Sequence, residues 1–101
     1  MHVLLALTSG ELHGYGILLE VERQAQGVYK MGPGTLYASL KKLLSQGLVQ
    51  EVQAADDIQT PRRKYHLTEL GAAVLRAETE RLSKVLKEAH QCLRLYGRTA
   101  S

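Results

Sequence analysis

Aromatic side chains are scarce in this sequence. The 101 residues include five tyrosines but no tryptophan and no phenylalanine. A hydrophobic core must therefore be built mainly from leucine, valine, isoleucine and alanine. Hydrophobic residues still make up 45% of the chain, which indicates a globular domain rather than a disordered one. The length suits one compact domain, and a domain this small buries a modest part of its surface, so a second copy would help to stabilise it.

Cysteine and long apolar runs are also nearly absent. Cys92 is the single cysteine, so an intramolecular disulfide is impossible and a reducing compartment is expected. The apolar run at residues 3–7 is too short to span a bilayer or to serve as a signal peptide. We therefore expect a cytoplasmic protein with no membrane association.

Acidic residues are missing from two stretches of the chain, although the formal net charge is only +3. Residues 23–50 and 58–68 contain no aspartate or glutamate. The cations within these stretches are Arg23, Lys30, Lys41, Lys42, Arg62, Arg63 and Lys64. A distribution of this kind is compatible with an anionic partner such as nucleic acid.

Apolar spacing and turn residues predict the element order helix, helix, helix, strand, strand, helix. The predicted helices cover residues 3–8, 13–26, 33–46 and 69–96, and the strands cover 48–53 and 62–67. In the second helix we expect His13 to close the first turn by hydrogen bonding. The face of that helix predicted to pack is formed by Tyr15, Leu18, Leu19 and Glu22.

The third predicted helix has two contrasting faces. Pro33 suits its first turn, and Gly47 is expected to end it in the left-handed conformation. One face is an apolar stripe of Leu36, Leu40, Leu43 and Leu44. The opposite face is small and basic and comprises Gly34, Ala38, Lys41, Lys42 and Ser45, flanked by Thr35 and Tyr37. Such a face is typical of a helix that lies against a binding partner.

The last predicted helix begins after Thr68, a good N-cap residue. Its continuous apolar band consists of Leu70, Val74, Leu75, Leu82, Val85, Leu86, Ala89 and Leu93. At a rise of about 1.5 Å per residue, the part from Leu82 to Leu93 runs past everything else in the chain. We expect a second copy to cover it.

These features predict a mainly α fold with a two-stranded β-wing, that is, a winged helix-turn-helix plus a C-terminal dimerisation helix. An α-helix fits the major groove of B-DNA, where base edges present distinct donors and acceptors. The hairpin can place cations against the flanking phosphates. The predicted organisation is a DNA-binding domain over residues 1–68, the dimerisation helix over 69–96 and a flexible tail over 97–101.

Several motifs resemble the PadR family of bacterial transcriptional regulators. They are His13-Gly14-Tyr15-Gly16-Ile17, Pro33-Gly34-Thr35-Leu36-Tyr37, the spaced Leu40, Leu43, Gly47, Leu48 and Val49, and Arg63-Lys64-Tyr65-His66-Leu67-Thr68-Glu69-Leu70-Gly71. The resemblance covers about residues 3–75, with the motifs in order and at the family's spacing. It implies a dimer formed by the last helix with the first. It also implies repression at an inverted-repeat operator, often relieved by a small molecule.

The basic face and the resemblance together select the expected site residues. The DNA-binding set is Gly34, Thr35, Tyr37, Ala38, Lys41, Lys42, Arg62, Arg63 and Lys64. The dimer-interface set is Leu4, Leu5, Leu75, Leu82, Leu86, Ala89 and Leu93. The expected partners are double-stranded DNA, a second copy of the chain and a small-molecule effector, and no cofactor is expected.

The sequence departs from the family pattern at several positions. Gly32 replaces a common helix-capping serine and Ala38 a frequent proline, so a looser entry turn is expected. Asp56 and Asp57, in the predicted loop over residues 54–61, would be repelled by phosphate and argue against deep insertion of the wing into the minor groove. Because the chain has no tryptophan, the stacking of flat ligands in a dimer pore, used by some members, does not carry over.

The alternative function is a winged helix that contacts protein instead of DNA, and the acidic wing loop favours it. Enzymatic and metal sites find little support. His90 and Cys92 are two residues apart and point to different sides of a helix. No catalytic Ser/His/Asp set, carboxylate pair or phosphate-cradling glycine loop is recognisable in the sequence.

Overall fold

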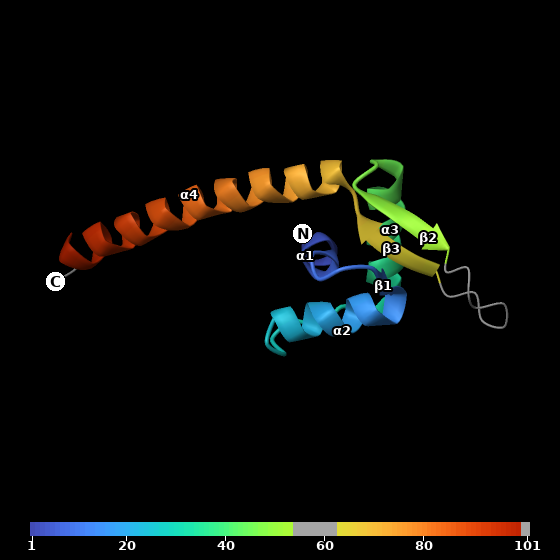
Figure 1. Ribbon diagram of the computed structural model, residues 1–101. Coiled ribbons are helices and arrows are strands. Elements are labelled where there is room, and N and C mark those ends of the chain that lie inside the picture. Colours follow the sequence, from blue (N-terminus) through green and yellow to red (C-terminus); the bar gives the residue numbers. More distant parts are fainter. Residues whose placement is uncertain (54–62, 100–101) are drawn as a thin grey trace.

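The elements follow the predicted order, with one addition. This computed structural model describes residues 1–53 and 63–99. Along the chain the elements are α1 (His2–Leu7), β1 (Leu12–His13), α2 (Gly14–Gln24), α3 (Pro33–Ser45), β2 (Val49–Gln53), β3 (Arg63–Leu67) and α4 (Glu69–Thr99). Figure 1 shows the first three helices gathered beside a small sheet, from which α4 runs outward. The fold is a winged helix-turn-helix with a long C-terminal helix, as predicted.

The added element is β1, which makes the sheet three-stranded. This two-residue strand pairs antiparallel with β3 and places Leu12 opposite Tyr65 and His13 opposite Lys64. β2 pairs with the other edge of β3, so the strand order is β1-β3-β2. A segment of two residues is too short to show the alternation of apolar and polar side chains that predicts a strand. β1 forms because β3 offers it hydrogen-bonding partners. The predicted two-stranded wing is therefore the larger part of this sheet.

The core is built from aliphatic side chains together with Tyr65 and Met31. α1 lies between α2 and α4 (Figure 1), and most of it is buried: Val3, Leu4, Ala6 and Leu7. Leu36 and Leu40 bring the apolar stripe of α3 into the same cluster. The leucines at 43 and 44 pack partly against it, which confirms the predicted inner face of α3.

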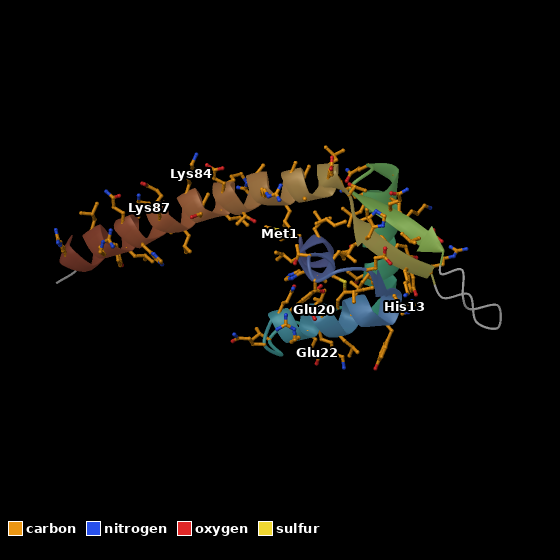
Figure 2. The ribbon with its side chains drawn as sticks, in the orientation of Figure 1. Met1, His13, Glu20, Glu22, Lys84 and Lys87 are labelled. Atoms are coloured by element: carbon orange, nitrogen blue, oxygen red, sulfur yellow. The ribbon has the colours of Figure 1, made fainter. Side chains whose placement is uncertain are left out.

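The packed face of α2 agrees with the prediction at Leu18, which packs partly against the core, and differs from it elsewhere. Ile17 and Val21 are buried, whereas Tyr15 is 71% and Leu19 is 49% exposed. Figure 2 shows Glu22 on the side of α2 that faces away from α1. Apolar residues occur on both sides of this helix, so periodicity alone does not select one. Contacts with α1 and α3 select the side of Ile17 and Val21.

His13 does not close the first turn of α2 as predicted. It is the extended N-cap residue and makes no side-chain capping hydrogen bond. Its Nδ1 is buried and has no hydrogen-bond partner among the described residues. The backbone at this point is held instead by the pairing of His13 with Lys64 in the sheet.

Two predicted helix ends are confirmed and lie against each other. Gly47 has a φ of +73°, and its amide donates to the Leu44 carbonyl at 3.1 Å, which closes α3. Thr68 Oγ1 accepts the Gly71 amide at 3.0 Å, as an N-cap does, and donates to the Gly47 carbonyl at 2.7 Å. A Cβ on Gly71 would lie 2.0 Å from the Leu48 carbonyl oxygen, so the first turn of α4 requires glycine there.

α4 leaves the rest of the chain after its first turns. Every residue from Thr79 to Arg98 is exposed, and the molecule measures 67 Å along its longest axis. The helix continues through Gly97 to Thr99, past its predicted end near residue 96, and the last two residues of the predicted tail over 97–101 lie outside the described residues. Gly97 does not adopt a positive φ and so does not stop the helix. None of the described helices carries an apolar stretch long enough to cross a membrane.

Candidate nucleic-acid interface

The outward face of α3 is open to solvent. The predicted DNA-binding residues on this helix are all exposed: Gly34, Thr35, Tyr37, Ala38, Lys41 and Lys42. Their positions follow from the buried stripe of Leu36 and Leu40, which turns the opposite side of the helix outward. A partner can therefore approach this face without any rearrangement of the core.

This face offers two unpaired cations and two small residues. Neither Lys41 nor Lys42 forms an ion pair with a described residue. A Cβ added to Gly34 would meet no heavy atom within 4 Å. With Ala38 one turn further along, the backbone of α3 can come close to the floor of a groove while the ammonium groups reach phosphates.

Tyr37 is positioned by the start of α2. Its ring is 57% exposed, but its hydroxyl lies close to Gly14. A Cβ built on Gly14 would come within 2.9 Å of Tyr37 Oη. Gly14 therefore provides the space that the Tyr37 hydroxyl occupies. The sequence places this glycine in a motif, but nothing in the local pattern indicates which side chain it faces.

The wing presents fewer free cations than the sequence predicts. Arg63 Nε lies 3.2 Å from Glu51 Oε1, in a pair whose side chains are 71% and 36% exposed. Lys64 is only partly exposed. The other residues expected at the wing lie outside the described residues: Arg62, Asp56 and Asp57. To bind a phosphate, Arg63 must therefore either contact Glu51 and the phosphate together or break its ion pair with Glu51.

Tyr65 links the wing electrostatically to α3. It is 5% exposed. Burial raises the pKa of its phenol, the charge of Glu51 and the presence of Tyr37 raise it further, and Arg63 lowers it. Tyr37 on α3 and Arg63 on β3 therefore border one region. Sequence reasoning missed Glu51, because its place beside Arg63 depends on the hairpin register that sets it opposite Tyr65.

The predicted dimer-interface residues fall into two groups. Leu4 and Leu75 are 5% and 7% exposed and belong to the core of the single chain. They are buried because α1 and the first turns of α4 pack on each other. Leu5 packs partly against the same core. The other group is exposed on the free part of α4: Leu82, Leu86, Ala89 and Leu93.

Cys92, which the sequence analysis considered as a metal ligand, has a hydrogen-bond partner in its own helix. The Cys92 thiol donates to Glu88 Oε1 at 3.7 Å. Within residues 1–53 and 63–99, no three histidine, cysteine, aspartate or glutamate side chains are grouped so that they could hold a metal ion.

Comparison with known sequences gives a family match over most of the chain. Residues 3–77 match the transcriptional regulator PadR-like family. The transcriptional regulator Rv3488 of Mycobacterium tuberculosis is 32% identical over 88 residues, which cover 87% of this chain and 78% of that protein. An uncharacterised 37.1 kDa protein in transposon TN4556 of Streptomyces fradiae is 36% identical over 98 residues. That match covers 97% of this chain but only 24% of the transposon protein.

Solved structures share the fold. A PadR family transcription regulator from Clostridium difficile superposes with a TM-score of 0.77 at 22% identity, covering 91% of this chain and 94% of that one. Bacillus subtilis PadR, solved in complex with operator DNA, gives a TM-score of 0.68 at 24% identity. That alignment covers 77% of this chain and 44% of the Bacillus protein.

Proposed function

Because the chain belongs to the PadR-like family of transcriptional regulators, we propose that it represses transcription as a homodimer bound to an inverted-repeat operator. The family and the fold are those of DNA-binding winged-helix transcription regulators and not those of an enzyme. The observation that carries the finer proposal is the exposed face of α3, with small residues near its start and two unpaired lysines further along. Acting on DNA, the protein would work in the cytoplasm.

In the proposed complex α3 lies in the major groove. Gly34, Thr35, Tyr37 and Ala38 face the base edges, and Lys41 and Lys42 hold the phosphates on either side. Bacillus subtilis PadR, which was solved with operator DNA, provides the precedent for this use of the fold.

The wing is proposed to contact the backbone that flanks the groove. Arg63 and Lys64 on β3, with Arg62 before them, are the candidate contacts. The Glu51 carboxylate next to Arg63 limits the strength of this contact, since Arg63 gives up an ion pair when it takes a phosphate. We therefore assign most of the binding free energy to α3.

The dimer is proposed to form through the exposed stripe of α4. Leu82, Leu86, Ala89 and Leu93 share one side of this helix, and no other described part of the chain buries them. A two-fold arrangement would present two α3 helices to half-sites about one helical turn, roughly 34 Å, apart. A small molecule that changes this arrangement would release the operator.

The test begins with duplexes selected from a random-sequence pool by the purified protein. Fluorescence anisotropy then gives the dissociation constant at several salt concentrations. Lys41→Ala should weaken binding and lower the slope of log K against log salt by about two, one phosphate contact per subunit. Lys87→Ala is the matched control, because Lys87 points away from the body on the outer side of α4 (Figure 2).

The same experiment separates DNA binding from the protein-contact alternative. The Arg63–Glu51 pair favours that alternative to a small degree, because it neutralises one of the wing cations. If no sequence is enriched and no duplex binds at low salt, the DNA proposal is wrong. If Lys41→Ala and Arg63→Ala combined leave the affinity unchanged, DNA binding stands but the assigned surface is wrong.

A further inference from the structure

The end of α3 and the start of α4 are tied together by hydrogen bonds that converge on Thr68. The Thr68 hydroxyl donates to the Gly47 carbonyl and accepts the Gly71 amide. Its backbone amide donates to the Leu48 carbonyl at 3.2 Å, and the Leu48 amide donates in turn to the Leu43 carbonyl at 3.0 Å. The turn that closes α3 is therefore bonded both to its own helix and to α4. Gly47, Leu48, Thr68 and Gly71 are called the junction below.

Two glycines let the junction close to direct backbone contact. A Cβ on Gly71 would overlap the Leu48 carbonyl oxygen and would lie 2.8 Å from Leu67 Cδ1. The Leu70 side chain lies over Gly47, with its Cδ2 4.0 Å from the position that a Cβ would take there. Hydrogen bonds weaken steeply when they are bent, so a contact of this kind fixes an angle as well as a distance.

The other anchor of α4 is its contact with α1, which brings buried leucine side chains together. A hollow of about 240 Å³ lies beside this contact and is lined by Met1, Leu4, Val74, Leu75 and Glu78. Apolar contacts are not directional, and the hollow leaves room for one helix to tilt on the other. The angle between α4 and the rest of the chain is therefore set chiefly by the junction.

A small change of this angle would be large at the DNA face. The start of α3 lies about 20 Å from Gly47, at a rise of about 1.5 Å per residue. A rotation of about 10° at the junction would move that end by about 3.5 Å, which is close to the separation of roughly 3.4 Å between successive nucleotides of a strand. An error of one base pair in the position of α3 therefore corresponds to a modest rotation.

We infer that Thr68 and Gly71 are positioning residues that fix the separation of the two α3 helices in the dimer and so determine which half-site spacing the protein accepts. Thr68 acts through the Gly47 carbonyl at the end of α3, and Gly71 acts by admitting the Leu48 carbonyl. The choice of spacing rests on the proposed function, because it requires a dimer on an inverted repeat. The fixed angle between α3 and α4 in the free chain does not.

The first test changes the spacing of the operator. Duplexes built on the selected inverted repeat carry one or two base pairs more or fewer between the half-sites, and fluorescence anisotropy gives each dissociation constant. For the wild type, one added base pair should raise the dissociation constant about tenfold. Thr68→Val keeps the shape of the side chain but removes both of its hydrogen bonds, so it should reduce this factor to about threefold or less. Thr68→Ser retains the hydroxyl and should restore the wild-type factor.

Ile17→Val is the matched control for a general loss of stability. Loss of a helix cap and loss of one buried methyl group destabilise proteins to a similar degree. Ile17 is fully buried in α2 and lies outside the junction, so its variant should keep the tenfold factor. The inference is wrong if Thr68→Val also keeps that factor, or if Ile17→Val lowers it as much. It is also wrong if Thr68→Val binds a duplex with a single half-site more weakly than the wild type, because the defect would then lie in the DNA face itself.

The second test needs no DNA. Nitroxide labels at Thr35→Cys, near the start of α3, and at Lys87→Cys, on the outer side of α4, report the angle between the two helices in a chain that also carries Cys92→Ser. Both labelled positions are exposed. Mixing with an excess of unlabelled chain restricts double electron–electron resonance to distances within one subunit. The wild-type junction should give one narrow distance distribution, which Thr68→Val broadens by several ångströms and Thr68→Ser does not.

The two tests separate the inference from the proposed function. If no duplex binds at all, the proposed function is wrong, and the distance distribution still decides whether the junction fixes the angle. A distribution that Thr68→Val leaves as narrow as in the wild type overturns the inference, whatever the result with DNA.

Discussion

Leu86→Glu is expected to convert the proposed dimer into monomers that remain folded. Leu86 is 56% exposed in the single chain, so the substitution removes little from the monomer and much from the interface. Full burial of a leucine is worth about 1.5–3 kcal/mol, so the exposed part contributes about 1–1.5 kcal/mol per subunit. Two symmetric copies double this, and the loss raises the dimer dissociation constant roughly 30- to 150-fold. The carboxylates carried into the interface add a desolvation cost to that figure.

Sedimentation velocity over a dilution series measures the dissociation constant, and circular dichroism melts check the monomer fold. Gln91→Glu is the matched control, because Gln91 follows Lys84 by seven residues and Lys87 by four, which puts it on their side of the helix. Both lysines point away from the body (Figure 2). The self-association of Gln91→Glu should equal that of the wild type. A Leu86→Glu protein that dimerises as tightly as the wild type would refute the assignment of the stripe, and a wild type that is monomeric at high concentration would refute the dimer itself.

Three further substitutions test the DNA face. Gly14→Ala should weaken operator binding about tenfold at nearly unchanged melting temperature, because the added methyl group displaces the Tyr37 hydroxyl and no backbone atom. Glu51→Gln should tighten operator binding several-fold in low-salt anisotropy titrations, because it frees Arg63 and removes a negative charge near the phosphates. Tyr65→Phe should reduce the loss of stability at alkaline pH seen in urea titrations. Because the folded-state pKa of Tyr65 is raised, its contribution is fully present below pH of about 10 and disappears as the pH rises through that pKa.

Gly16→Ala should leave operator binding intact, because a Cβ there meets its nearest side-chain atom at an ordinary 3.6 Å. If Gly14→Ala behaves in the same way, the tyrosine is not a DNA contact. If Glu51→Gln binds DNA no better at low salt, the wing does not reach the backbone. For Tyr65→Phe, an alkaline profile identical to the wild type would show that another group controls stability in that range.

Local signals in the sequence were enough for the features that depend on neighbouring residues. Pro33 lies at the start of α3 and Gly47 lies just beyond its end. Thr68 caps α4 with its side chain, and the leucine stripe of α3 is buried as predicted. These features depend on backbone geometry within a few residues or on the helical period, and both can be read along the chain. The exposed basic face of α3 follows from the same period.

Contacts between distant segments decided the rest. The strand at Leu12 exists because β3 pairs with it, and α1 and α3 choose which side of α2 is buried. The Tyr37 hydroxyl lies against Gly14 only because α2 and α3 pack on each other. Glu51 forms an ion pair with Arg63 only because the strand register brings the two side chains together. Periodicity records which faces of an element are apolar but not which surface each face meets, so these arrangements are properties of the tertiary structure.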